Sequence, residues 1–178
     1  MSETNDKLRL YEALELRAEY DARITTLKDC LPETRQNRGR LIWDREEGGK
    51  LRPSSDFNMV VVRDQIRSLE FKRRKLNSAI QEANFQHRIH FSGNAISLNE
   101  ALEIRKGLNR ELGELHSQVV DSAYQRVIYK EDRDIVEPNE LSYAQSTTIL
   151  EGARLTFREL NRKIRAATFE VELDFRDE

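Results

Sequence analysis

Apolar residues recur along most of the chain at the three- and four-residue spacing of helices that bury one face. Four helices are predicted. The first has apolar residues at positions 10, 13, 14, 20, 24, 27 and 31, and it should kink or end near Leu31 because Pro32 cannot continue it. The third follows Ser97, which forms a Ser-x-x-Glu capping box with Glu100.

The second and fourth helices are predicted over about 55–90 and 139–173, each with one apolar stripe. The stripe of the second helix contains Val62, Ile66, Leu69, Leu76, Ile80 and Ala83. The stripe of the fourth helix contains Leu150, Ala153, Phe157, Ile164, Ala167 and Val171. Helices of this kind must pack against one another to keep these stripes from water.

The two halves of the chain repeat one pattern. Residues 10–17 and 98–105 are identical at six of eight positions, at an offset of 88 residues. Further matches follow in the same order at offsets of 86, 85 and 84, and the last relates Leu76-Asn77 to Leu160-Asn161. We therefore interpret residues 1–178 as a single domain built from two helix–hairpin–helix repeats, residues 7–91 and 95–175.

Short apolar stretches separated by turns lie between the two helices of each repeat, and they predict small β-hairpins over about 41–51 and 126–136. The turn Ser92-Gly93-Asn94 joins the repeats. A rod of about 35 residues is roughly 50 Å long and cannot bury its stripe alone. The predicted fold class is therefore mainly α: an elongated four-helix, up-down-up-down bundle with the small β-hairpins at one end.

Composition fits this fold, because charged residues make up 35% of the chain and apolar residues only 38%. The 30 basic and 32 acidic residues are mixed, so we expect no binding to duplex nucleic acid. No apolar segment approaches the roughly 20 residues of a membrane span. The polar N-terminus and the lone Cys30 lead us to expect a soluble, cytoplasmic protein that does not bind membranes.

Recognisable catalytic and cofactor motifs are absent from the sequence, so no catalytic residue and no cofactor is predicted. His87 and His90 lie three residues apart and offer two nitrogens, but no further metal ligand is close in the sequence. We interpret them as exposed histidines at a helix end and expect no metal site. Cys30 is interpreted as a small apolar residue.

Arg17 and Arg105 occupy matched positions on the apolar stripes of the first and third helices. A buried guanidinium needs an anionic partner, because an unpaired buried charge is very costly. We favour an ion pair with a glutamate of a neighbouring helix. The alternative is a twofold pair of arginines that binds a phosphate or carboxylate ligand.

Four other residues complete the candidate ligand-binding set. Asn77 and Asn161 lie beside the stripes and are expected to hydrogen-bond across the bundle. Trp43 and Tyr129 occupy matched places in the two hairpins. We favour their capping the end of the bundle, and the alternative is that they stack against a base or ring.

Several motifs resemble a family of uncharacterised bacterial and phage helical proteins, the septicolysin-like family. They are the helix start Glu-Ala-Leu-Glu-x-Arg, the turn Glu46-Glu47-Gly48, and the passage from Asn77 through Asn84 and Gly93 to residues 98–102. The resemblance covers most of residues 8–173 and implies helical hairpins and oligomer formation without an established activity. Family members often have an acidic residue after the arginine, where this chain has Ala18 and Lys106.

These features favour a non-enzymatic helical scaffold or partner-binding protein that forms a homo-oligomer through its hairpin end or its exposed helix faces. The alternative is an oligomeric protein that binds or sequesters a small anionic nucleotide through Arg17 and Arg105, in phage–host conflict. An enzyme, the third hypothesis, would need the same arginines with Glu12 or Glu100 as the base.

Overall fold

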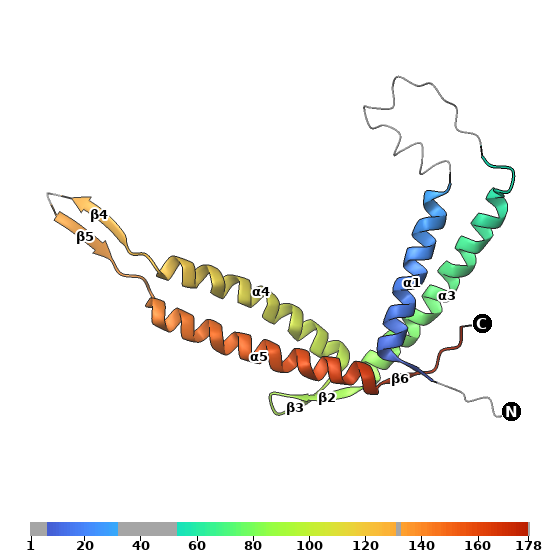
Figure 1. Ribbon diagram of the computed structural model, residues 1–178. Helices are drawn as coiled ribbons and strands as arrows, with labels where there is room; N and C mark the ends of the chain where they lie inside the picture. The colour runs from blue at the N-terminus through green and yellow to red at the C-terminus, as the bar shows by residue number, and fades with distance from the viewer. Residues whose placement is uncertain (1–6, 32–52, 131–132, 178) are drawn as a thin grey trace, which may run out of the picture. The chain divides into compact units, whose positions relative to one another are not determined.

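The computed structural model describes residues 7–31, 53–130 and 133–177 (Figure 1). Their helices are α1 (Leu10–Asp29), α3 (Met59–Gln86), α4 (Leu98–Ser122) and α5 (Tyr143–Glu170). Their strands form three antiparallel ladders: β1 (Leu8–Arg9) with β6 (Glu172–Leu173), β2 (Arg88–Phe91) with β3 (Asn94–Ser97), and β4 (Arg126–Lys130) with β5 (Arg133–Glu137). The predicted mainly-α fold of four helices with small hairpins is confirmed. The hairpin expected at 41–51 lies outside the described residues.

The chain divides into two compact units. Unit 1 takes in the described parts of Met1–Ala83 and Val171–Glu178, and unit 2 is Asn84–Glu170. Unit 1 contains α1 and most of α3, while unit 2 contains α4, α5 and the hairpin β4–β5 beyond their ends (Figure 1). The interpretation as a single domain and the boundaries of the two repeats stay predictions.

The helices begin where local side chains satisfy their free N–H groups. The Ser97 hydroxyl accepts the N–H of Glu100 at 3.1 Å, and α4 begins at the next residue, as the capping box predicts. Ser142 and Gln145 form a reciprocal capping box at the start of α5: Oε1 of the Gln145 side chain accepts the Ser142 N–H, and the Ser142 hydroxyl accepts the Gln145 N–H. At its other end, α1 stops at Asp29, near the predicted break.

Two predicted helix ends are wrong. α3 ends at Gln86 rather than near His90, because residues 88–97 form the hairpin β2–β3. Its turn residues Ser92 and Gly93 have φ values of 50° and 82°, the paired positive values of a two-residue turn that suits the twist of a hairpin. Likewise, α5 ends at Glu170, and the next residues form β6. The predicted turn at 92–94 is confirmed.

The predicted apolar stripes contain most of the buried residues of the helices, although the stripe predicted for the fourth helix omits Leu160 and Ser146. The buried residues of α1 are Leu10, Ala13, Tyr20 and Ile24, and those of α3 are Ile66, Leu69, Leu76 and Ile80. In α5 they are Ser146, Leu150, Leu160, Ile164 and Ala167. α4 differs, because only Leu98 and Ala101 near its start are fully buried. The rest of α4 is therefore held against α5 by a half-exposed seam.

Two ladders use residues that the sequence repeat relates. Leu8 pairs with Leu173 in unit 1, and Ile96 pairs with Ile89 in unit 2. Ile96 follows Leu8 by 88 residues, and Leu173 follows Ile89 by 84. These are the offsets that relate the first and second helices of the two halves, so the two ladders have the same register.

The backbone hydrogen bonds at the starts of α1 and α4 also join residues that the sequence repeat relates. The N–H of Leu10 donates to the carbonyl of Val171 at 2.8 Å, and the N–H of Leu98 donates to that of His87 at 2.9 Å. In each unit the first helix thus begins with a hydrogen bond to the residue between a second helix and the strand that follows it. In unit 1 that strand is β6, which follows α5 in the chain.

In unit 1, α1 and α3 run antiparallel and are joined by polar contacts along their length. The contacts are Arg17 Nη1 to Asn77 Oδ1 at 3.4 Å, Arg73 Nη1 to Asp21 Oδ1 at 2.6 Å, and Lys28 Nζ to Glu70 Oε1 at 2.6 Å. The ion pairs are partly exposed, so each contributes at most about 1 kcal/mol. Their main effect is to fix how the two helices are aligned along each other, and they add little to the stability of unit 1.

Candidate functional site

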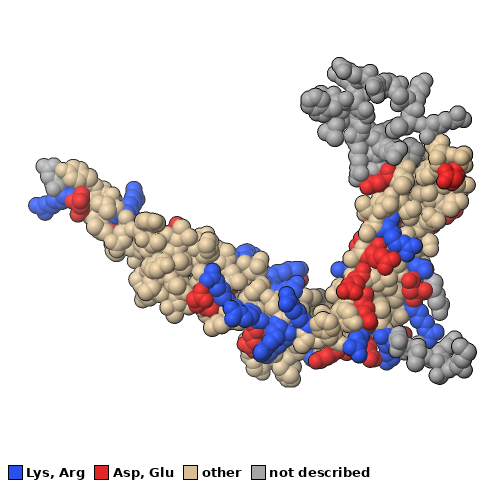
Figure 2. All heavy atoms as spheres, viewed as in Figure 1, with Lys and Arg blue, Asp and Glu red and all other residues tan. Residues whose placement is uncertain are grey.

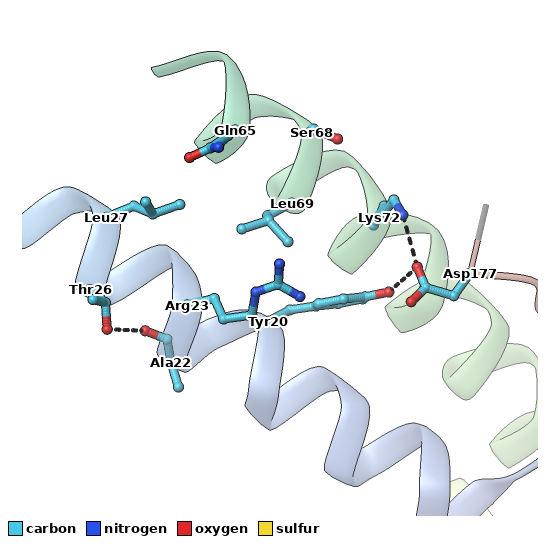
Figure 3. A pocket seen from close by; sticks show the side chains of 10 residues that line it. All are labelled: Tyr20, Ala22, Arg23, Thr26, Leu27, Gln65, Ser68, Leu69, Lys72 and Asp177. Carbon is cyan, nitrogen blue, oxygen red and sulfur yellow. Dashed lines mark hydrogen bonds and ion pairs between the residues drawn. The ribbon is translucent and has the colours of Figure 1, made fainter. Parts of the chain in front are cut away.

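A hollow of about 510 Å³ lies between α1 and α3 of unit 1 (Figure 3). Tyr20, Arg23 and Leu27 line it from α1, Leu69 and Lys72 line it from α3, and Asp177 adds the C-terminal segment. Figure 3 shows the ring of Tyr20 crossing from α1 toward α3, with its hydroxyl directed at Asp177. The remaining lining residues are Ala22, Thr26, Gln65 and Ser68.

Tyr20, Lys72 and Asp177 form one hydrogen-bonded group at the end of this hollow. The Tyr20 side chain is only 1% exposed, and its hydroxyl donates to Oδ1 of Asp177 at 2.5 Å. Nζ of Lys72 donates to the same oxygen at 3.0 Å. We call these three residues the C-terminal latch, because they join the segment after β6 to both helices of unit 1.

The two acidic groups of the latch have pKa values shifted in opposite directions. The hydrogen bond from Tyr20, helped by Lys72, lowers the pKa of Asp177 from its ordinary 3.8. Burial, and then the hydrogen bond to Asp177, raises the pKa of Tyr20 above its ordinary 10.0. A general acid or base works best with a pKa near the working pH. Because both shifts lead away from neutrality, the latch is suited to holding the C-terminal segment rather than to proton transfer.

The latch is expected to lose stability as the pH rises above about 10. Folding raises the pKa of Tyr20, so its contribution is complete below its unfolded pKa of 10.0 and is lost as the pH rises through the folded value. The measurement is urea unfolding of the wild type and of Tyr20→Phe, from neutral to strongly alkaline pH. The difference in stability between them should shrink above pH 10, and a difference that stays constant would contradict the prediction.

Asp177 acts at the other end of the pH scale. Folding lowers its pKa, so its contribution is present above its ordinary pKa of 3.8 and is lost as the pH falls below that value. The latch should therefore be complete between about pH 4 and pH 10.

The structure brings two of the predicted ligand-binding residues together. Arg17 and Asn77 share the 3.4 Å contact across unit 1, and both are half-buried. Arg105 and Asn161 are also half-buried, but they lie in unit 2. Neither arginine forms an ion pair with a carboxylate within the described residues, and the shared twofold anion site stays a prediction.

The other residues singled out in the sequence, two aromatics, the histidines and the cysteine, do not form a common site within the described residues. Trp43 lies outside the described residues, while Tyr129 is on β4 and 69% exposed. His90 is exposed on β2 rather than at a helix end. The residues that the structure describes contain no group of three metal-ligating side chains. Cys30 is exposed directly after α1, so it does not contribute to the apolar core.

Sequence reasoning placed Tyr20 on the apolar stripe but missed its two partners in the latch. Lys72 lies in a run of basic residues that reads as a solvated helix face. Asp177 is 157 residues from Tyr20, in a segment without a motif. No sequence signal joins residues that far apart.

A second feature is a group of exposed apolar residues at the end of unit 2 that carries the hairpin β4–β5. We call it the distal surface and define it as Val120, Tyr124, Val127, Tyr129, Ile135, Val136 and Tyr143. Tyr124 is the most exposed of these, at 81%. The first eight residues of α5, 143–150, contain no charged side chain. Figure 2 shows the helical part of unit 2 next to the hairpin as largely uncharged on this face, with charged side chains on the hairpin and toward the other end of the helices.

No protein-family model matches the chain, and no curated protein or solved structure matches it. The resemblance to septicolysin-like proteins therefore stays a prediction. Each helix within the described residues is too polar to cross a lipid bilayer.

Proposed function

We propose that the protein is a non-enzymatic helical scaffold that self-associates through the distal surface of unit 2. The observation that carries this proposal is the clustering of large exposed apolar side chains on β4, β5 and the adjoining ends of α4 and α5. Scattered exposed apolar residues are ordinary, whereas several of them gathered on one small part of a molecule mark a place that contacts another molecule. In the hairpin, Val127, Tyr129 and Val136 share one face, and Ile135 lies on the other.

The hairpin itself supports the proposal. Val127 and Val136 are directly opposite each other in the β4–β5 ladder, and both are about half exposed. A two-stranded hairpin is at best marginally stable in water and gains stability from further strands or a covering surface. Since all five residues of β5 are exposed, self-association would supply that cover.

The latch supports a structural role over a catalytic one. Its tyrosine and aspartate have pKa values that move away from neutral pH, and its lysine is already hydrogen-bonded to the aspartate. Its contacts join the C-terminal segment to the helices of unit 1, as a scaffold requires.

The double variant Val127→Thr, Val136→Thr is expected to weaken self-association about tenfold or more. Threonine keeps the β-branched shape that strands favour, but it replaces one methyl group by a hydroxyl, so it loses apolar contact at the surface. The measurement is the dissociation constant from sedimentation equilibrium or light scattering over a range of concentrations.

The matched control is Val60→Thr, Val61→Thr at the start of α3, where both valines are also exposed. This control should self-associate like the wild type. A wild type that stays monomeric at every concentration would contradict the proposal, and so would equal weakening by both pairs of substitutions.

A further inference from the structure

We infer that two copies of the chain pair through the outer edges of their β5 strands, forming one antiparallel four-stranded sheet about a twofold axis at Ile135. This inference rests on the proposed function, because it names the partner of the distal surface as a second copy and specifies the contact. It follows from the exposure, the register and the charges of the hairpin β4–β5.

The hairpin leaves β5 available as an edge strand. Within the described residues its ladder has two strands, so β4 and β5 each pair on one side only. β5 reads Arg133-Asp134-Ile135-Val136-Glu137, and every one of these residues is exposed. An exposed edge with apolar residues is a template for pairing with another strand.

The charges of β5 are complementary to those of a second β5. When two copies lie antiparallel and centred on Ile135, each Arg133 is opposite a Glu137 of the other copy. Opposite charges at directly opposed positions stabilise an antiparallel pair, and like charges destabilise it. By symmetry the favourable pair occurs twice, once at each end of the contact.

Pairing through the outer edge of β4 and pairing of β5 in a register shifted by one residue are both disfavoured. β4 reads Arg126-Val127-Ile128-Tyr129-Lys130, so the same arrangement would place Arg126 opposite Lys130 of the other copy. A register centred on Asp134 would place that carboxylate opposite itself. Only the β5 arrangement centred on Ile135 pairs all five residues without opposing like charges.

The arrangement also builds a continuous apolar row. Ile128 pairs with Ile135 inside each hairpin, so two hairpins joined at Ile135 place four isoleucines side by side across one face of the sheet. An isolated hairpin lacks such a row, and a sheet needs three or more strands with an apolar face to be stable by itself. Because the contact is symmetric, it closes on itself as a dimer.

Charge reversal tests the pairing in the full-length protein. Arg133→Glu and Glu137→Arg should each weaken self-association about tenfold or more, because each places like charges opposite one another at both ends. An equimolar mixture of the two variants should associate more tightly than either variant alone, since the two acidic side chains of one variant then face the two basic side chains of the other. Recovery is expected to be partial, because Glu137→Arg also loses the 3.6 Å ion pair of Glu137 with Arg126 in its own hairpin. Sedimentation velocity of each variant and of the mixture measures this, with circular dichroism as a check of folding.

Arg110→Glu on α4 is the matched control and should leave self-association unchanged, because Arg110 is exposed in the middle of that helix and is not part of the hairpin. Weakening by each β5 variant with recovery in the mixture would support the pairing. A wild type that self-associates while the β5 variants do so equally well would overturn the pairing and leave the proposed function standing. Weakening without recovery in the mixture would also overturn it. A monomeric wild type would overturn both.

Discussion

Replacing Tyr20 with alanine is expected to lower the free energy of unfolding by about 3–5 kcal/mol. The ring is 1% exposed and lies between α1 and α3, so the variant loses the buried apolar surface and leaves a cavity in unit 1. It also removes the hydrogen bond that joins the hydroxyl to Asp177. The measurement is urea unfolding followed by far-ultraviolet circular dichroism.

Two controls separate these contributions. Tyr20→Phe keeps the ring and loses only the hydroxyl, so we expect a cost of about 1 kcal/mol, kept modest by the partial exposure of the Asp177 carboxylate. Phe71→Ala removes a ring that is half exposed on α3 and should cost less than Tyr20→Ala. If Tyr20→Ala cost no more than Phe71→Ala, Tyr20 would not belong to the core of unit 1.

Leu76→Ala and Leu160→Ala are each expected to destabilise the protein by about 2–5 kcal/mol. The two leucines are related by the 84-residue offset, and both side chains are 0% exposed. Truncation at either position removes apolar contacts from a packed interior that relaxes only partly. The measurement is again the free energy of unfolding in urea, from the midpoint and slope of each transition.

Leu155→Ala is the matched control for Leu160→Ala, because Leu155 lies on the same helix but is 60% exposed. Its expected effect is about 0.5 kcal/mol or less. Comparable losses at positions 155 and 160 would show that the side of α5 on which Leu160 lies is not its core face. A much larger loss at Leu160 than at Leu76 would show that matched positions do not bear equal weight in the fold.

Local sequence reasoning recovered the parts of the fold that depend on neighbouring residues. The start of α4 follows from the hydroxyl of Ser97, and the end of α1 follows from Pro32, since each acts within one turn of helix. The stripes of α3 and α5 follow from the helical period, because a face that is apolar must be buried.

The misplaced helix end at Gln86 shows where periodicity alone is ambiguous. Ile89 and Phe91 continue an apolar pattern that reads as helix or strand over so few residues. Ile96 is the residue that indicates a hairpin, because it follows Ile89 and Phe91 after a turn that contains Gly93 and can pair with them as a second strand. In the hairpin all three residues are buried, and this burial favours a strand over a continued helix at residues 88–91.

For the candidate sites, the sequence determined residue types and the faces on which they lie. The prediction of Asn77 and Arg17 near the core stripes agrees with their half-buried contact in unit 1. The sequence also predicted β4 and β5 as a hairpin, and the opposed charges along β5 can be read directly from residues 133–137. Each of these results depends on side chains a few residues apart.

Only the tertiary structure placed Leu173 beside Leu8 and Asp177 against Tyr20. A sequence specifies which surfaces must leave water, but many partners satisfy an apolar face equally well. The choice between partners depends on geometry summed over the whole chain, and no local pattern specifies which residues more than 150 positions apart will meet.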